Sequence, residues 1–301
     1  MDFLLLYILC LVSSILFSWN NSSLFVSGMT SSGAAKFRYS VIFTVLSMFL
    51  GLMLEGWKMN PSKLIIFNSF EIPLIAILVV LLICSVLAIP VSISNIAVAS
   101  LIGSSLALNI QVNQIFLTIT VLSWILAPLA TMYLSKLIYL LLMKLSRCIR
   151  MGELYFYTRL IIYSTSFYGA YTISANNLGF ILSMLSGYSI SLYPIVYIGI
   201  LIGASIFSEK ISYVIGDRLA ILSPLKLSSS LLSSSLLLWI LTQVGIPAAL
   251  TQIMIGGLVG AALSSSTHII NVRLFKKLIL SWVASFLLGV VFSYILVIIL
   301  K

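Results

Sequence analysis

Long stretches without a charged residue dominate the pattern of hydrophobic and polar positions along this chain. Lys226 and Arg273 bracket 46 such residues, Arg159 and Glu209 bracket 49, and Glu71 and Lys136 bracket 64. A helix needs roughly 20 apolar residues to cross a bilayer, so each stretch is long enough to cross more than once. The runs are apolar on every side, whereas the strands of a membrane β-barrel alternate. The sequence therefore predicts an all-α polytopic membrane protein with about ten hydrophobic helical segments.

The order of these segments repeats along the chain. Four pairs of short strings recur at an offset of 156 to 158 residues: Ser18–Asn21 with Ser174–Asn177, Ile89-Pro90 with Ile246-Pro247, Gly103 with Gly260, and Ser123-Trp124 with Ser281-Trp282. A constant offset in the same order indicates an internal repeat. We therefore expect two transmembrane repeats, residues 1–150 and 151–301.

Each repeat reads as the same succession of elements. An apolar helix runs into an Asn-Asn pair, a second helix ends near an acidic residue, and a third segment is interrupted at a proline, resumes as a Gly-containing helix and leads to a long last helix. In the first repeat the expected ranges are 3–19, 39–57, 72–89 and 115–143, and the third segment resumes after its proline and ends at about 108. In the second repeat they are 156–173, 191–207, 228–245 and 278–300, and the third segment resumes after its proline and ends at about 263. With no basic region before it and no cleavage site, the first segment is expected to be retained.

The interruptions at Pro90 and Pro247 are the best candidates for a binding site. Proline removes a backbone donor and breaks the helix, and in hydrocarbon the freed polar groups need partners from protein or a water-lined cavity. Paired interruptions in two halves of a transporter mark its substrate site, although a proline can also kink a packed helix. Polar side chains follow both prolines: Ser92, Ser94, Asn95, Thr251 and Gln252.

Composition and charge exclude several classes. Only 7% of the residues are charged and 61% are hydrophobic, against about 25% charged in soluble domains. The net charge of +10 reflects basic residues flanking membrane spans rather than a nucleic-acid surface. The three cysteines form no CxxC and no even framework, which gives no sign of a disulfide or metal site.

The positions of the basic residues predict an orientation. If each repeat crosses the membrane an odd number of times, the repeats are inverted, and an outside N-terminus places 13 Lys and Arg residues inside and three outside. The positive-inside rule favours this arrangement. We therefore expect a plasma-membrane protein with both termini outside and Lys58, Lys63 and Lys301 as its outside cations.

The chemistry available at the breaks is neutral. No Asp, Glu, Lys, Arg or His lies in the middle of a span, and the single histidine, His268, lies in a Ser-rich loop and is expected to be solvated. A proton relay or transition-metal site would show ionisable groups there. We expect helix N-termini after Asn21, Asn95, Asn177 and Gln252, whose free N–H groups suit an oxyanion. No cofactor is predicted.

These residues resemble the inorganic phosphate transporter family. Its members have two inverted repeats, each with a Gly-Ala-Asn-Asp-x-Ala-Asn motif, a Pro-Val-Ser-Thr-Thr-His motif and a later Ser-Trp. Pro90–Asn95 and Pro247–Gln252 are similar to the Pro-Val-Ser-Thr-Thr-His motif. Asn20 and Asn176 fall on the first asparagine of the Gly-Ala-Asn-Asp-x-Ala-Asn motif. The resemblance covers nearly the whole chain. It implies a permease for inorganic phosphate whose substrate-binding residues are Asn20, Asn21, Ser92, Ser94, Asn95, Asn176, Asn177, Thr251 and Gln252.

The departures from the family pattern concern charge. The family's two motif aspartates, implicated in cation and phosphate binding, fall on Asn21 and Asn177. The absence of these carboxylates weakens the case for coupling to sodium. Sodium and a proton both remain possible coupling ions. Hydrogen phosphate also has an O–H that needs an acceptor, whereas sulfate does not, so sulfate remains an alternative substrate.

Two other classes of function are weighed against a carrier. A membrane-embedded enzyme would need a nucleophile with a base, or a metal, and neither is visible in the spans. A non-transporting membrane subunit with the same fold is compatible with the missing aspartates. The expected partners are phosphate or sulfate, the lipid bilayer and, left open, a second copy in a homodimer, but no nucleic acid.

Overall fold

The computed structural model describes residues 3–87, 91–185, 188–215, 223–264 and 272–300. Every regular element in this part of the chain is helical. The elements of the first half are α1 (Phe3–Ser31), α2 (Phe37–Glu55), η1 (Gly56–Lys58), η2 (Pro61–Lys63), α3 (Glu71–Val86), α4 (Ile93–Leu108) and α5 (Gln114–Ser146). Those of the second half are α6 (Met151–Ile173), η3 (Ser174–Leu178), α7 (Gly179–Leu182), η4 (Ile190–Leu192), α8 (Tyr193–Ile215), α9 (Pro224–Val244), α10 (Leu250–Leu263) and α11 (Val272–Leu300).

The predicted all-helical membrane fold is confirmed. Among the described residues, five helical segments are long and apolar enough to cross a membrane: Phe3–Ser31, Phe37–Lys63, Gln114–Ser146, Pro224–Val244 and Lys276–Leu300. Shorter apolar helices, among them α3, α4 and α10, are 14 to 16 residues long. Helices of that length do not span about 30 Å of hydrocarbon on their own. Each of these short helices therefore packs against a neighbour in sequence: α3 against α4, and α10 against the longer α9.

One pair is α3 with α4, which pack on each other and form a hairpin. The chain before α3 and the chain after α4 meet, because the Asn113 amide donates to the Leu64 carbonyl at 2.9 Å and its side chain donates to the Lys63 carbonyl at 3.1 Å. Both open ends of this hairpin thus lie at one end of the bundle. Its interruption includes Pro90, which falls outside the described residues.

The second pair is α9 with α10, and its interruption is fully described. Helix α9 ends at Gly245, whose φ of 77° is a left-handed conformation that glycine adopts without a steric cost. Pro247 then lacks the N–H that would continue the helix, and α10 starts only at Leu250. The break adjoins η2, since Lys63 Nζ donates to the Val244 carbonyl at 2.9 Å.

Helices of the two halves pack on each other in matching pairs. Helix α8 lies on α1 and α2 lies on α6; α11 lies on α4 and α10 lies on α5. Small residues allow the close approaches typical of membrane helices. A Cβ at Gly103 would collide with the Val290 carbonyl, and one at Gly260 with the Met132 carbonyl. These two contacts are related by the same offset of 157 to 158 residues that the sequence shows.

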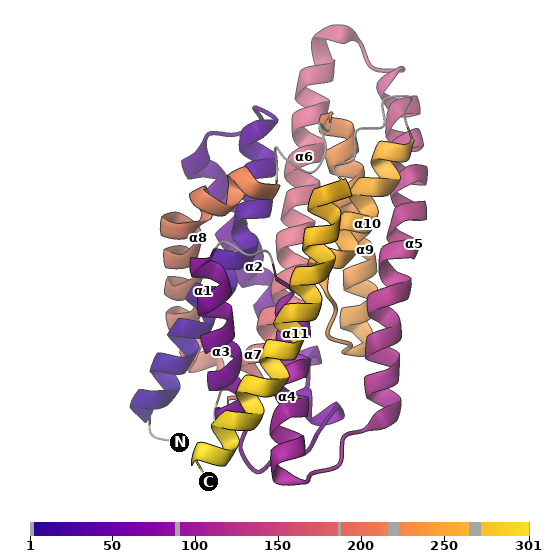
Figure 1. Cartoon of the computed structure of the whole chain (residues 1–301). Coiled ribbons are helices and arrows are strands. Elements are labelled where there is room, and N and C mark those ends of the chain that lie inside the picture. Colours follow the sequence, from indigo (N-terminus) through magenta and orange to yellow (C-terminus); the bar gives the residue numbers. More distant parts are fainter. Residues whose placement is uncertain (1–2, 88–90, 186–187, 216–222, 265–271, 301) are drawn as a thin grey trace.

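Figure 1 shows where the ends of the chain lie. The N-terminus and the C-terminus are at one end of the molecule, and the connection between α5 and α6 is at the other. Basic residues Lys144, Arg147 and Arg150 flank that connection. The predicted solvated histidine, His268, lies outside the described residues.

Candidate functional site

Asn176 holds the break between α9 and α10 in place. It lies in η3, a π-helical turn that follows α6, and its side chain is 0% exposed. Its Nδ2 donates to the Ile246 carbonyl and to Thr242 Oγ1, both at 3.0 Å, and its Oδ1 accepts from the Ala248 amide at 2.9 Å. Backbone groups freed by Pro247 are thus satisfied by one side chain, as buried polar groups require. A π-turn inside a helix is frequent at functional sites.

The two interruptions meet beside Asn176. Ser94, in the first turn of α4, donates its hydroxyl to Asn177 Oδ1 at 2.7 Å and to the Ala248 carbonyl at 2.6 Å. All three residues are buried. The structure therefore brings three predicted site residues, Ser94, Asn176 and Asn177, together with the Pro247 break.

Two side chains close to this junction have polar atoms without a partner in the described structure. Asn95 Oδ1 and Thr251 Oγ1 are buried and make no hydrogen bond. They lie in the first turns of α4 and α10, where backbone N–H groups and a partial positive charge are available. Ser92 caps α4 by accepting from the Asn95 amide at 3.4 Å. An acceptor, a hydroxyl and two helix N-termini are thus concentrated where the hairpins meet.

Gln252 faces a different environment. It lines an apolar cavity of about 400 Å³ between α5, α10 and α11, together with Trp124, Pro128 and Trp282. No hydrogen bond within the described residues joins Gln252 to Ser94 or Asn177. The structure therefore does not unite Gln252 with the other site residues through a polar contact.

The predicted helix starts after Asn21 and Asn177 are wrong. Asn21 lies inside α1, which continues to Ser31, and its Nδ2 donates to the Phe17 carbonyl at 2.9 Å. Asn177 lies inside η3, which runs directly into α7. An apolar helix continues through an amide pair because the side chain bonds one turn back without displacing the backbone ladder. Asn20 is partly buried on α1, and no hydrogen bond among the described residues joins it to Ser94 or Ala248.

Sequence reasoning missed several residues that shape the site. Trp124 was only a repeat marker, yet its Nε1 donates to the Pro247 carbonyl at 3.0 Å. Thr242 is likewise unexpected; it accepts from Asn176 and donates to the Leu238 carbonyl at 2.8 Å. The recurrence of Ser-Trp at a constant offset was the available signal for Trp124.

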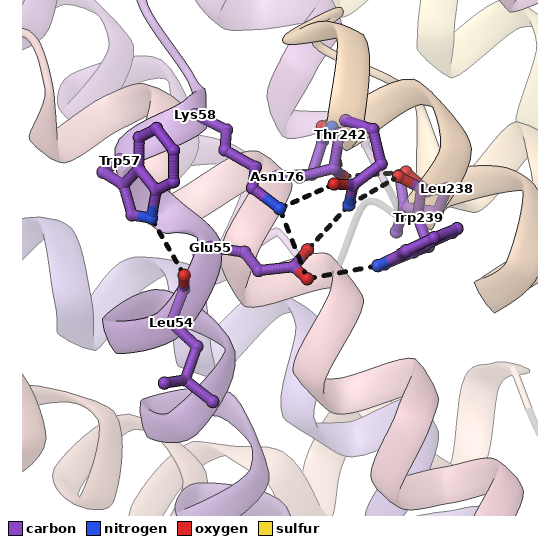
Figure 2. Close-up of polar contacts among 9 residues, drawn as sticks. Leu54, Glu55, Trp57, Lys58, Asn176, Leu238, Trp239 and Thr242 are labelled. Atoms are coloured by element: carbon purple, nitrogen blue, oxygen red, sulfur yellow. Dashed lines mark hydrogen bonds and ion pairs between the residues drawn. The ribbon is translucent and has the colours of Figure 1, made fainter.

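Figure 2 shows a charged cluster next to Asn176 that sequence reasoning also missed. Glu55, at the end of α2, accepts from Trp239 Nε1 at 3.2 Å and from Gln243 Nε2 at 2.9 Å, and pairs with Lys58 at 3.5 Å. Lys58 also donates to Gln243 Oε1 at 2.6 Å. Because Trp239 and Gln243 belong to the last turns of α9, the cluster fastens the end of that helix to α2. The contacts span more than 180 residues of sequence.

The junction offers neutral donors and acceptors. Within the described part of the chain no three His, Cys, Asp or Glu residues gather as metal ligands. Hydroxyls, amides and helix N-termini suit a small anion, and free carbonyl oxygens suit a hard cation.

The fold and this junction define a polytopic membrane protein in which two helical hairpins meet at their interruptions, the arrangement of secondary transporters. Comparison with known proteins gives a family match over part of the chain. The model of the phosphate transporter family matches residues 156–293, and the predicted resemblance to the inorganic phosphate transporters is confirmed.

One relative and one solved structure match almost the whole chain, and a second relative matches about a third of it. A protein of Methanocaldococcus jannaschii assigned as a phosphate permease is 23% identical over 285 residues, which cover 92% of this chain and 91% of the relative. One from Chlamydia pneumoniae with the same assignment is 26% identical over 96 residues, or 32% of this chain and 22% of that protein. A solved structure named as the sodium-dependent phosphate transporter has the same fold, with a TM-score of 0.79 at 14% identity, over 99% of this chain and 98% of that one.

Proposed function

We propose that this chain is a permease that moves inorganic phosphate across the membrane by alternating access. The observation that supports this most directly is the contact of Ser94 with Asn177 and Ala248, which joins the two hairpin interruptions at one point. The family match and the relatives assigned as phosphate permeases support phosphate as the substrate.

The buried acceptor at Asn95 favours phosphate over sulfate. Asn95 is 4% exposed and its Oδ1 has no partner in the described structure, and an unpaired buried acceptor costs about 1–3 kcal/mol. The hydroxyl of hydrogen phosphate would satisfy it, whereas sulfate has no proton to donate. The hydroxyl of Thr251, whose Oγ1 also has no partner in the described structure, could donate a hydrogen bond to either anion.

We further propose that the chain consists of two inverted transmembrane repeats, residues 1–150 and 151–301. The pairs α8 on α1 and α2 on α6, with α11 on α4 and α10 on α5, support this division, since each pair recurs with the halves exchanged. Both termini lie at one end and the basic α5–α6 connection at the other (Figure 1), which supports an outside location of both termini by the positive-inside rule.

Radiolabelled uptake into proteoliposomes containing only the purified chain tests the proposal. We expect phosphate uptake, and a rise in phosphate KM of roughly 5- to 150-fold for Ser94→Ala, the equivalent of losing a buried hydrogen bond worth about 1–3 kcal/mol. Ser104→Ala is the matched control, because Ser104 is also a buried serine of α4 with a hydrogen bond to another helix, at 2.6 Å to Ser293.

The substrate argument is tested by Asn95→Ala. This change should raise the KM for phosphate while leaving that for sulfate nearly unaltered. Absence of phosphate uptake by the native chain would reject a carrier and favour the non-transporting subunit. Equal losses in Ser94→Ala and Ser104→Ala would show that Ser94 acts through packing only.

A further inference from the structure

Arg159 lies between two adjoining cavities at the end of the molecule remote from the termini. The first, of about 330 Å³, is lined by Ser32, Tyr155 and Thr158 among others. The second, of about 540 Å³, is lined by Lys36 and by aromatic and aliphatic residues of α2 and α6. Tyr155 bridges the α1–α2 connection to α6 through a hydrogen bond to the Gly33 carbonyl at 3.3 Å. Both cavities therefore lie where the α1–α2 connection meets the first turns of α6.

The two cations at these cavities have no carboxylate partner among the described residues. Neither Arg159 nor Lys36 forms an ion pair with a described residue, unlike Lys58, which pairs with Glu55 at 3.5 Å. The Arg159 guanidinium instead lies over the Tyr163 ring, 5.8 Å from its centroid, which orients it without neutralising it. Lys36 precedes α2 and is exposed. The cavities thus combine tyrosine hydroxyls with two positive charges that no described carboxylate neutralises.

An apolar stripe continues from the second cavity along α2. Tyr39, Ile42 and Leu46 line it and are 66%, 52% and 45% exposed. Residues three and four apart lie on one face of a helix, so the stripe runs away from Lys36 toward the middle of α2. A ligand that fits must have an anionic head and an apolar chain attached to it.

We propose that these cavities bind an anionic phospholipid, with its phosphate between Arg159 and Lys36 and one acyl chain along Ile42 and Leu46. Basic cavities between membrane helices bind such head groups. Free inorganic phosphate matches the two cations but leaves the apolar stripe unused. A surface that places an apolar stripe next to two cations therefore fits a lipid better than free phosphate. This site is separate from the junction of the hairpins, since none of its residues contacts Ser94 or Asn177 in the described structure.

The test uses the purified full-length chain and measures binding of dioleoylphosphatidylglycerol by native mass spectrometry and by thermal stabilisation in detergent. Dioleoylphosphatidylcholine and inorganic phosphate are the comparison ligands. The variants are Arg159→Gln and Lys36→Gln, each of which should weaken phosphatidylglycerol binding about fivefold, the effect of one basic residue at a membrane surface. Lys144→Gln is the matched control, because Lys144 is exposed in the last turn of α5 and lines neither cavity.

The outcomes are distinct. Tighter binding of phosphatidylglycerol than of phosphatidylcholine, reduced by both variants and not by Lys144→Gln, supports the site. Equal binding of the two lipids, or equal weakening in all three variants, overturns it. Stabilisation by inorganic phosphate that Arg159→Gln abolishes, without any by phosphatidylglycerol, would assign the cations to a free anion and also overturn it. If Arg159→Gln fails to fold, Lys36→Gln decides, because its exposed side chain precedes α2.

Discussion

Asn176→Asp is the sharpest perturbation of the junction, because it changes hydrogen bonding with almost no change in shape. The carboxylate keeps the bond from the Ala248 amide but loses the two donated by Nδ2 to Ile246 and Thr242, both 3.0 Å long. Each lost bond is worth about 1 kcal/mol, and leaving the Ile246 carbonyl buried without a donor costs about 1–3 kcal/mol more. We therefore expect a loss of about 3–5 kcal/mol in folding free energy.

The pH dependence of this loss has a definite sign. Burial disfavours the ionised carboxylate, so the folded-state pKa of an aspartate at 176 should exceed its unfolded value. Between the two values the folded chain binds more protons than the unfolded one, so stability rises as the pH falls through the folded pKa. The protonated acid can also donate one of the missing hydrogen bonds. The variant should thus recover part of its stability at low pH.

The assay is thermal unfolding of the detergent-purified chain at pH 8 and pH 5, each variant compared with the native protein at the same pH. Asn177→Asp is the control, since its Oδ1 already accepts from Ser94 and a carboxylate accepts equally well. At pH 8 we expect Asn176→Asp to unfold at a lower temperature than Asn177→Asp. At pH 5 the difference in unfolding temperature between the two variants should be smaller. Equal stability of the two variants at pH 8, or a deficit of Asn176→Asp that does not change with pH, would refute the reasoning.

Three further expectations concern coupling, the charged cluster and orientation. Asn177→Asp should increase the sodium dependence of phosphate uptake in proteoliposomes, whereas Asn21→Asp should mainly destabilise the chain, because Asn21 donates to the Phe17 carbonyl; strict sodium dependence of the native protein would contradict the coupling argument. Glu55→Gln should cost about 1 kcal/mol in unfolding experiments, since it removes the ion pair with Lys58 and two charge-assisted hydrogen bonds, and an unchanged melting temperature would show that solvent already screens the cluster. Cys148 is the exposed one of three free cysteines, so an impermeant maleimide should label inverted vesicles and spare intact cells; labelling of intact cells would reverse the proposed orientation.

The residues at the junction are of two kinds: those that a signal in the sequence marked, and those that no such signal marked. Ser94, Asn176 and Asn177 could be predicted because they lie beside a proline break or in a string that recurs at a constant offset. Trp124 also lies in a recurring string, which marked its position but not its bond to Pro247. Thr242 and Glu55 lie in no such string, and their partners Asn176 and Trp239 are 66 and 184 residues away. Nothing in the spacing of the sequence relates Glu55 to Trp239.

The helices of this protein follow from local features of its sequence. Hydropathy decides which segments leave water, and Gly245 and Pro247 decide where α9 ends, since both effects act within a few residues along the chain. How the helices combine depends on tertiary contacts: α4 lies on α11 while α10 lies on α5, and Ser94 meets Asn177 and Ala248. In a membrane every helix satisfies its own backbone, so the choice of neighbour rests on interhelical packing and side-chain bonds, which no local pattern specifies.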